Sequence, residues 1–343
     1  MAAPDFQKLL AGPEYDFLRN NEHLGKRVMI LGLSGSYGYG TNREGSDVDF
    51  RGVALQRPSD ILGLTEFEQY TDTVTDTVVF GFNKFVRLLL ECNPSCCEVL
   101  GLPPDKYMIL SSPGKALLEN SALFLSKRAV KSFGGYASAQ LRRLQNALAR
   151  DALPQPDREK HILNSVKNAM DDFCRRSARA GAGSIRLYID KAVTEGMETE
   201  IFSDIDYTHL PLRDMCGMLD TLRCVLRDYD KIGHRNHKKD EGHLNKHAMH
   251  LIRLLMTGID ILEKHTVVTY RKDDLPLLMK IRNGDYMLPD GTMSPEFYEL
   301  LDMYEHRFEE AARKTTLPDE PDMDRIGAFV EYINRRAVTE DFE

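Results

Sequence analysis

The first third of the chain consists of short apolar runs separated by turn residues. Arg27–Leu33 reads RVMILGL, an apolar run with β-branched residues that is typical of a buried strand. Three later runs are rich in valine, threonine and aromatic residues, so further strands are expected at Asp47–Leu55, Phe67–Asp72 and Thr75–Phe82. Apolar periodicity predicts helices at Asp5–Asn20 and at Asn83–Cys92, where Pro94 stops the second helix. Together these elements predict a mixed sheet with helices that ends near Leu110.

From Ser112 onward the apolar positions follow the period of a helix. Helices are expected over Gly114–Leu125, Lys131–Leu148, Asp157–Arg176, Leu212–Asp230, Glu241–Lys264, Leu275–Arg282, Pro295–Lys314 and Asp322–Arg336. One segment interrupts them: Ser184–Leu210 alternates polar and apolar residues around Glu195-Gly196, which predicts an inserted β-hairpin. The expected organisation is an α/β domain over residues 1–110, followed by a mainly helical domain over residues 111–343 with the hairpin at about 184–210.

A glycine-serine pair and two aspartates stand close to the ends of the first two expected strands. Gly35 follows the first strand, and a glycine there lets backbone N–H groups approach an anion, while Ser36 adds a hydroxyl donor. Asp47 and Asp49 are two residues apart, so on a strand their carboxylates share one face, about 6–7 Å apart. Two such carboxylates can hold divalent ions that lie roughly 3.5–4 Å from each other. This arrangement suits metal-assisted chemistry on a nucleoside triphosphate.

The same residues resemble a known signature. Gly35-Ser36, followed after residues 37–45 by Ser46-Asp47-x-Asp49, is similar to the signature of the polymerase-β-type nucleotidyltransferase superfamily. Later segments resemble one branch, the predicted nucleotidyltransferases associated with bacterial RNA repair: Asp47-x-Asp49-x-Arg51-Gly52, Asn83-Lys84-Phe85, Asn93-Pro94 with Glu98, Phe133-Gly134-Gly135-Tyr136-Ala137 with Gln140, and Lys246-His247-Ala248-x-His250-Leu251-Ile252-Arg253-Leu254-Leu255. The resemblance extends from about Val28 to Gly284. It implies a nucleotidyltransferase-type mixed sheet (α+β or α/β) as the catalytic domain, a nucleoside triphosphate as substrate, and Mg²⁺ or Mn²⁺ as cofactor.

A two-metal site needs a third carboxylate, which also aligns the attacking hydroxyl. Asp76 opens the run that leads into the Lys84 helix, and the resembled family tends to place an acidic residue there; Asp72 and Glu68 are the alternatives. Arg51 is two residues beyond Asp49, so strand alternation puts it on the same face, where it can meet a phosphate or orient a carboxylate. The expected catalytic and metal-binding residues are Asp47, Asp49 and Asp76, with nucleotide contacts from Gly35, Ser36, Ser46 and Arg51.

Two helices supply the remaining candidates for nucleotide binding. Lys246, His250 and Arg253 fall at i, i+4 and i+7, so they form one row along a helix. A cationic row that faces the aspartates would neutralise triphosphate or pyrophosphate charge; the alternative is a basic stripe in water. On the earlier helix, Lys131, Tyr136 and Gln140 can contact base or ribose, with Tyr136 as a stacking surface, and ordinary packing is the alternative there.

Other metal and thiol chemistry is not expected. His243 and His247 are four residues apart, but no nearby cysteine or glutamate completes a zinc ligand set. The six cysteines show no Cys-x-x-Cys spacing, so reduced structural thiols are expected.

Charge limits the polynucleotide partners. The 343 residues carry a formal net charge of −8, which argues against a broad binding surface for duplex nucleic acid. RNA contact then requires a local basic surface, for which the candidates are Arg142, Arg143, Arg150, Arg175, Arg176, Arg179, Arg235, His237, Lys238 and Lys239. No apolar stretch reaches the ~20 residues that span a bilayer, and Met1–Phe6 lacks a signal-peptide pattern, so a cytoplasmic protein without membrane contact is expected.

These features predict a metal-dependent enzyme that moves a nucleoside monophosphate from a nucleoside triphosphate to an acceptor hydroxyl and releases pyrophosphate, with an RNA end as the expected acceptor. The alternatives are transfer to a protein or small-molecule hydroxyl, and a nucleotide-sensing protein that keeps the fold without turnover. The sequence leaves open the acceptor, the base, the number of nucleotides added, the oligomeric state and any protein partner.

Overall fold

The computed structural model describes residues 4–152, 163, 167, 183–193, 199–208, 211–220, 223 and 241–342. Contacts divide the chain into two compact units: Met1–Leu141 with Asn245–Tyr286 and Ser294–Glu343, and Arg142–Leu244 with Met287–Met293. This division does not test the predicted boundary at residue 110, because one compact unit can hold more than one folding domain. The boundary therefore stays a prediction.

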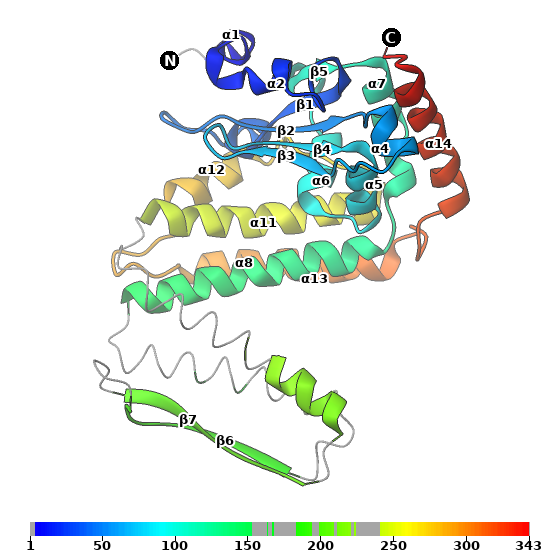
Figure 1. Cartoon of the computed structure of the whole chain (residues 1–343). Helices are drawn as coiled ribbons and strands as arrows, with labels where there is room; N and C mark the ends of the chain where they lie inside the picture. Colours follow the sequence, from blue (N-terminus) through cyan, green and yellow to red (C-terminus); the bar gives the residue numbers. More distant parts are fainter. Residues whose placement is uncertain are drawn as a thin grey trace. The chain divides into compact units, whose positions relative to one another are not determined.

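A five-stranded mixed sheet forms the centre of the first unit, in the order β3-β4-β2-β1-β5 (Figure 1). Its strands are β1 Val28–Ser34, β2 Asp49–Ala54, β3 Gln69–Asp72, β4 Thr77–Gly81 and β5 Tyr107–Leu110. β1 is antiparallel to β2 and β5, β2 is parallel to β4, and β3 is antiparallel to β4. The predicted mixed sheet and its four strands are confirmed. The edge strand β5 was not predicted, because four half-buried residues give too short a pattern.

Helices cover both faces of this sheet. Figure 1 shows α1 (Phe6–Leu10) and α2 (Phe17–Asn20) on one side, and α5 (Phe82–Leu90), α6 (Pro94–Leu100) and α11 (Glu241–Lys264) on the other. The further helices are α3 Gly35–Tyr39, α4 Pro58–Leu62, α7 Ser112–Glu119, α8 Arg128–Ala152, α12 Leu275–Asn283, α13 Pro295–Lys314 and α14 Met323–Thr339. Short 3₁₀ turns lie at Pro13–Tyr15, Gly25–Arg27, Pro104–Lys106 and Ser121–Phe124.

The single N-terminal helix predicted for Asp5–Asn20 is wrong. The chain leaves α1 at Ala11, and Pro13 starts a 3₁₀ turn because its ring fixes φ and removes a backbone donor. Arg19 of α2 closes this corner by donating to the carbonyl oxygens of Leu10 at 2.5 Å and Gly12 at 2.8 Å. The segment still packs on the sheet as expected, because its apolar residues join the core formed with β1, β2 and β4.

The later helices mostly agree with their predictions. α11 and α13 have the predicted bounds, and α12 and α14 differ from them by at most three residues at either end. The expected helix Gly114–Leu125 is instead α7 followed by a 3₁₀ turn. In the second unit, β6 (Gly183–Lys191) and β7 (Thr199–Tyr207) pair antiparallel along their whole length, so the inserted hairpin is confirmed. Residues 212–220 of the helix predicted at 212–230 are helical; apart from residues 163, 167 and 223, the rest of that helix, the helix predicted at 157–176 and the hairpin turn lie outside the described residues.

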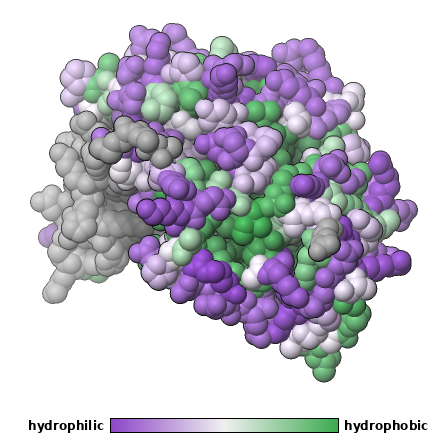
Figure 2. Space-filling model, turned by 90° about the horizontal axis from the view of Figure 1, so that it is seen from above, coloured by the Kyte–Doolittle hydropathy of each residue, from purple (hydrophilic) through white to green (hydrophobic). Residues whose placement is uncertain are grey.

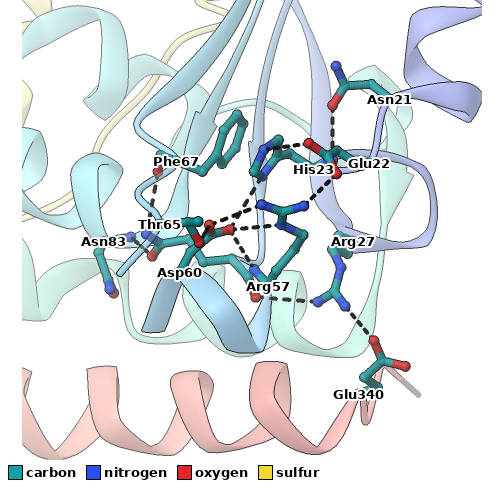
Figure 3. A network of polar contacts seen from close by, with 11 residues as sticks. Asn21, Glu22, His23, Arg27, Arg57, Asp60, Thr65, Phe67, Asn83 and Glu340 are labelled. Atoms are coloured by element: carbon teal, nitrogen blue, oxygen red, sulfur yellow. Dashed lines mark hydrogen bonds and ion pairs between the residues drawn. The ribbon is translucent and has the colours of Figure 1, made fainter. Parts of the chain in front are cut away.

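A polar network ties the N-terminal segment to the chain after β2 (Figure 3). The Asp60 side chain is fully buried and accepts from Thr65 Oγ1 at 2.7 Å and from Arg57 Nε at 3.3 Å. Burial alone would raise the pKa of Asp60, but these hydrogen bonds outweigh it and lower the pKa. Arg57 also pairs with Glu22 at 2.6 Å, and His23 Nδ1 lies 3.3 Å from Asp60 Oδ2. The ionised Asp60 therefore holds the segment that precedes β1.

The face that carries α1 is partly apolar at its surface. Phe6, Leu9, Met108 and Ile109 are only partly buried where they pack against the core. Seen from above, apolar residues gather near the middle of this surface and hydrophilic residues surround them (Figure 2). None of the helices in the described part of the chain combines the length and the apolar character needed to cross a bilayer.

Candidate active site

One edge of the sheet brings together the ends of three strands. Ser34, the last residue of β1, pairs with Asp49, the first residue of β2. β2 and β4 are parallel, with Phe50 opposite Thr77, so Asp49 at the start of β2 and Asp76 just before β4 lie at the same edge. Residues that are far apart in the sequence therefore meet where α3 begins.

The glycine of the Gly-Ser pair lies directly against a carboxylate. Gly35 has φ +54°, and a Cβ atom built on it would lie 1.9 Å from Oδ2 of Asp49. Only glycine fits a position that combines a left-handed backbone with this approach. Gly35 and Ser36 form the first turn of α3, which extends the predicted turn into a short helix. The backbone of the Gly-Ser pair and the Asp49 carboxylate thus face one small volume.

The negative charge of Asp49 is only partly compensated. Burial raises its pKa, and the charge of Asp76 and, more weakly, that of Asp47 raises it further. The positive charges of Arg51 and Lys246 offset only part of this rise. The charged neighbours of Asp49 are thus four of the candidate site residues named from the sequence, and they come from four different segments of the chain.

Asp47 is placed differently from its prediction. β2 begins at Asp49, so Asp47 is an exposed residue of the preceding loop and strand alternation does not set its direction. Ser46 lies in the same loop, where its Oγ accepts from the backbone N–H of Arg43 at 2.8 Å. The expectation that both aspartates belong to one strand is therefore wrong, although Asp47 still acts on Asp49 electrostatically.

Among the three candidates for the third carboxylate, Asp76 is the one beside Asp49. Arg51 holds it there, because Nη1 donates to the Asp76 carbonyl oxygen at 2.5 Å and Nη2 to Oδ1 at 3.1 Å. Asp72 instead accepts from the backbone N–H and hydroxyl of Thr75, both at 2.8 Å. Glu68 is tied to Lys84 at 2.8 Å. The geometry therefore favours Asp76 and gives Arg51 the role of orienting a carboxylate.

The carboxylates suit a hard divalent cation in kind and in charge. Oxygen donors are what Mg²⁺ and Mn²⁺ prefer, and a cation would relieve the repulsion that raises the pKa of Asp49. Within the described residues, however, no three histidine, cysteine or acidic side chains stand close enough to form a ready metal site. One reason is that Asp76 turns toward Arg51. To bind one metal ion jointly, the carboxylates of Asp47, Asp49 and Asp76 would have to move closer to one another.

Burial increases along the predicted cationic row on α11, from Lys246 through His250 to Arg253. Lys246 is exposed and acts on Asp49, as predicted. Burial lowers the pKa of His250 well below its ordinary value, and the charges of Arg253 and Lys246 lower it further, so His250 is neutral at pH 7. Arg253 is buried. The expectation of three cations facing the aspartates is therefore wrong, because two of the three positions point into the protein.

Arg253 instead belongs to a buried network that holds α3. Its guanidinium donates to Glu98 of α6 and stacks over the Tyr39 ring, with 3.6 Å from Cζ to the ring centroid. The Tyr39 hydroxyl donates to the other oxygen of Glu98, and burial raises the pKa of Tyr39 so that this proton stays in place. Sequence reasoning gave Glu98 no part, although an acidic residue in the apolar run Cys96–Leu100 is a signal of burial and pairing.

Glu98→Gln is expected to lower the free energy of unfolding by about 3–5 kcal/mol, because it leaves the buried Arg253 without a counter-charge. Urea unfolding followed by circular dichroism measures this change. Tyr39→Phe is the matched comparison, since it removes one hydrogen bond and keeps the ion pair, at a cost of about 1–3 kcal/mol. Equal stability of Glu98→Gln and the unmodified protein would contradict this role.

The α8 candidates lie beside α6 and α11. Tyr136 is 45% exposed, and its hydroxyl accepts from Asn93 Nδ2 at 3.3 Å. Gln140 Oε1 is 3.2 Å from His247 Nδ1, and Lys131 is exposed on the same helix. Their contact with nucleotide stays a prediction. Of the basic candidates for RNA, the exposed ones are Arg142 and Arg143; the side chains of the others lie outside the described residues.

Comparison with known proteins agrees with this geometry. Residues 15–162, which include the whole five-stranded sheet and the three carboxylates, match the family model RlaP, described as the RNA repair pathway DNA polymerase beta family. No curated protein and no solved structure matched the chain. The fold is thus of the nucleotidyltransferase type, and the resemblance seen in Gly35-Ser36 and Asp47-x-Asp49 is confirmed by a match of residues 15–162 to the RNA repair pathway DNA polymerase beta family.

Proposed function

We propose that this protein is a nucleotidyltransferase that moves a nucleoside monophosphate from a nucleoside triphosphate to the hydroxyl of an RNA end and releases pyrophosphate. The observation that carries the proposal is the position of Asp49, which lies against the backbone of Gly35 and beside Asp76 and Asp47. A phosphate-approaching backbone and a cluster of carboxylates at one sheet edge are the two parts that phosphoryl transfer requires. The name of the matched family supports RNA as the acceptor.

Asp47, Asp49 and Asp76 would hold Mg²⁺ or Mn²⁺, which neutralises triphosphate charge and polarises the reacting phosphorus when bound. Arg51 keeps Asp76 oriented through Oδ1, which leaves Oδ2 for the proton of the acceptor hydroxyl. Lys246 stands beside Asp49, where its ammonium group stabilises the charge of the departing pyrophosphate. The Tyr39-Glu98-Arg253 network keeps α3, and hence Gly35 and Ser36, in place.

Incubation with each labelled nucleoside triphosphate, Mg²⁺ or Mn²⁺ and total RNA tests the proposal. We expect a labelled product that ribonuclease removes and protease leaves intact. Label on protein would overturn RNA as the acceptor and would point to transfer to a protein side chain. Tight nucleotide binding without any labelled product would favour a sensing protein instead. Absence of both binding and product would contradict the whole proposal.

Asp76→Asn is expected to lower the turnover rate by at least ~10²-fold, because the acceptor side loses a positioned base or ligand. Triphosphate affinity should stay within a few-fold of the unmodified protein, since the acceptor side contributes less to that binding. Single-turnover rates and calorimetric affinities measure the two effects separately. Asp72→Asn and Glu68→Gln are the controls, and a larger rate loss in either would move the third carboxylate to that position.

A further inference from the structure

The loop between α3 and β2 is held by a side chain that reaches another helix. Arg43 donates through Nη2 to the carbonyl oxygen of Arg282 and, at 2.7 Å, to Oδ1 of Asn283, both at the C-terminal end of α12. Inside the loop, the N–H of Arg43 donates to Ser46 Oγ at 2.8 Å, and the N–H of Ser46 donates to the Arg43 carbonyl oxygen at 3.1 Å. The contact with α12 is therefore passed on to the residue directly before Asp47.

The end of α12 offers an acceptor that the helix itself does not use. The last carbonyl groups of a helix have no N–H partner within it. In α12, the two N–H groups that follow the helix donate to the carbonyl oxygens of Lys280 and Ile281, at 3.1 and 3.2 Å. The next carbonyl, that of Arg282, accepts from Arg43 instead. A cation at this end also complements the helix dipole, so the contact is favourable for two reasons.

The end of α12 is itself packed against α11. Gly284, which ends α12 with φ +90°, lies so close to α11 that a Cβ atom on it would be 2.8 Å from Nδ2 of Asn245. Figure 1 shows α12 next to the N-terminal end of α11. Further along α11, Arg253 joins this helix to α6 through its ion pair with Glu98. Arg43 thus ties the loop to packed helices.

Asp47 depends on this loop for its position, whereas Asp49 does not. Asp49 is the first residue of β2 and pairs with Ser34 of β1, so the sheet fixes its backbone. Asp47 is exposed and lies two residues before the strand. In the part of the chain that the structure describes, Arg43 is the only residue of 42–48 whose side chain forms a hydrogen bond outside the loop. The position of Asp47 therefore depends on where Arg43 holds the loop.

We propose that Arg43 is a positioning residue of the metal site: by binding the C-terminal end of α12, it holds the loop that presents Asp47 beside Asp49. This inference rests on the proposed function, in which both aspartates hold Mg²⁺ or Mn²⁺. Arg43 acts through the loop and touches neither the ion nor the nucleotide. Loss of a residue that orients a metal ligand in this way typically lowers metal affinity by roughly 10- to 100-fold.

Calorimetric titration of the nucleotide-free protein with Mn²⁺ tests this role. Arg43→Ala is expected to weaken Mn²⁺ binding by about 10-fold or more, because Asp47 is no longer held beside Asp49. The lost charge has the opposite effect, since removal of a cation near the site would by itself strengthen Mn²⁺ binding. Lys280→Ala is the matched control, because it removes the same charge from an exposed position in the last turn of α12. Its Mn²⁺ affinity should stay within about 2-fold of the unmodified protein.

Two further variants address the same contact from both of its ends. Arg43→Lys keeps a cationic donor for the Arg282 carbonyl, so its Mn²⁺ affinity should return to within about 3-fold of the unmodified protein. Asn283→Ala changes no charge and removes only the acceptor at 2.7 Å, so Mn²⁺ binding should weaken by about 3-fold. Hydrogen exchange in the metal-free proteins follows the loop itself: the Ser46 amide should exchange faster in Arg43→Ala and at the unmodified rate in Lys280→Ala.

Mn²⁺ affinity that is unchanged or higher in folded Arg43→Ala, while the unmodified protein binds Mn²⁺, would overturn this inference and leave the proposed function standing. If Arg43→Ala does not fold, unchanged affinity in Asn283→Ala has the same meaning. Failure of the unmodified protein to bind Mn²⁺ would overturn both this inference and the metal site of the proposed function.

Discussion

Asp49→Asn is expected to remove most transfer activity and, in the metal-free protein, to raise the melting temperature. The activity falls by on the order of 10²-fold or more if the proposed function holds, because the variant then loses a carboxylate charge that would bind the metal beside the triphosphate. Stability rises for a separate reason: burial and the charges of Asp76 and Asp47 raise the pKa of Asp49, so its ionised form costs free energy at neutral pH. Asparagine keeps the shape and removes the charge.

The stability of the metal-free protein should change with pH in a definite direction. The folded protein holds the Asp49 proton more tightly than the unfolded chain does, so stability falls as pH rises from the unfolded pKa through the raised folded pKa. Thermal melts in a chelator across that range should show this fall in the unmodified protein and a smaller one in Asp49→Asn. Asp47→Asn makes the same charge change at an exposed position and should shift the melting temperature little. A lower melting temperature for metal-free Asp49→Asn would contradict the assignment.

Gly35→Ala is expected to lower transfer activity by about 10²-fold, because the new methyl group displaces the Asp49 carboxylate. Its Cβ would lie 1.9 Å from Oδ2, so the carboxylate or the α3 backbone must move by more than an ångström. Displacements of that size at a reacting centre cost about this much in rate. The left-handed φ of +54° adds a backbone cost of about 1–2 kcal/mol to the folded state.

Gly45→Ala separates the backbone cost from the displacement of the Asp49 carboxylate. Gly45 has φ +76°, but a Cβ atom added there would have none of the described atoms within 4 Å. It should lose a similar free energy of unfolding and keep its activity within a few-fold. Denaturant unfolding and initial rates, measured on both variants, make the comparison. Equal activities of the two variants would show that contact between Gly35 and Asp49 is not needed for the reaction.

Local patterns were enough for most of the regular structure. The apolar run before Gly35 forms the buried interior strand β1, and the long periodic segments form α11 and α13 with the predicted bounds. Both follow from residues close in sequence, since strand alternation and helical periodicity act over a few positions. Sequence patterns did not predict structure that depends on a few residues, such as the break in the N-terminal helix at Pro13 and the four-residue strand β5.

The sequence by itself therefore determined the mixed sheet, most of the long helices and the chemical character of Gly35, Ser36 and the aspartates. Only the tertiary structure decided which charges face each other. It brought Asp76 to Asp49 through the parallel pairing of β2 and β4, turned Arg253 inward to Glu98, and set Arg43 beside Arg282. The sequence alone does not show whether the partner of a charged residue is water, a buried carboxylate or a ligand. Which of these partners it has depends on strand order and burial, and both arise from contacts between residues far apart in the chain.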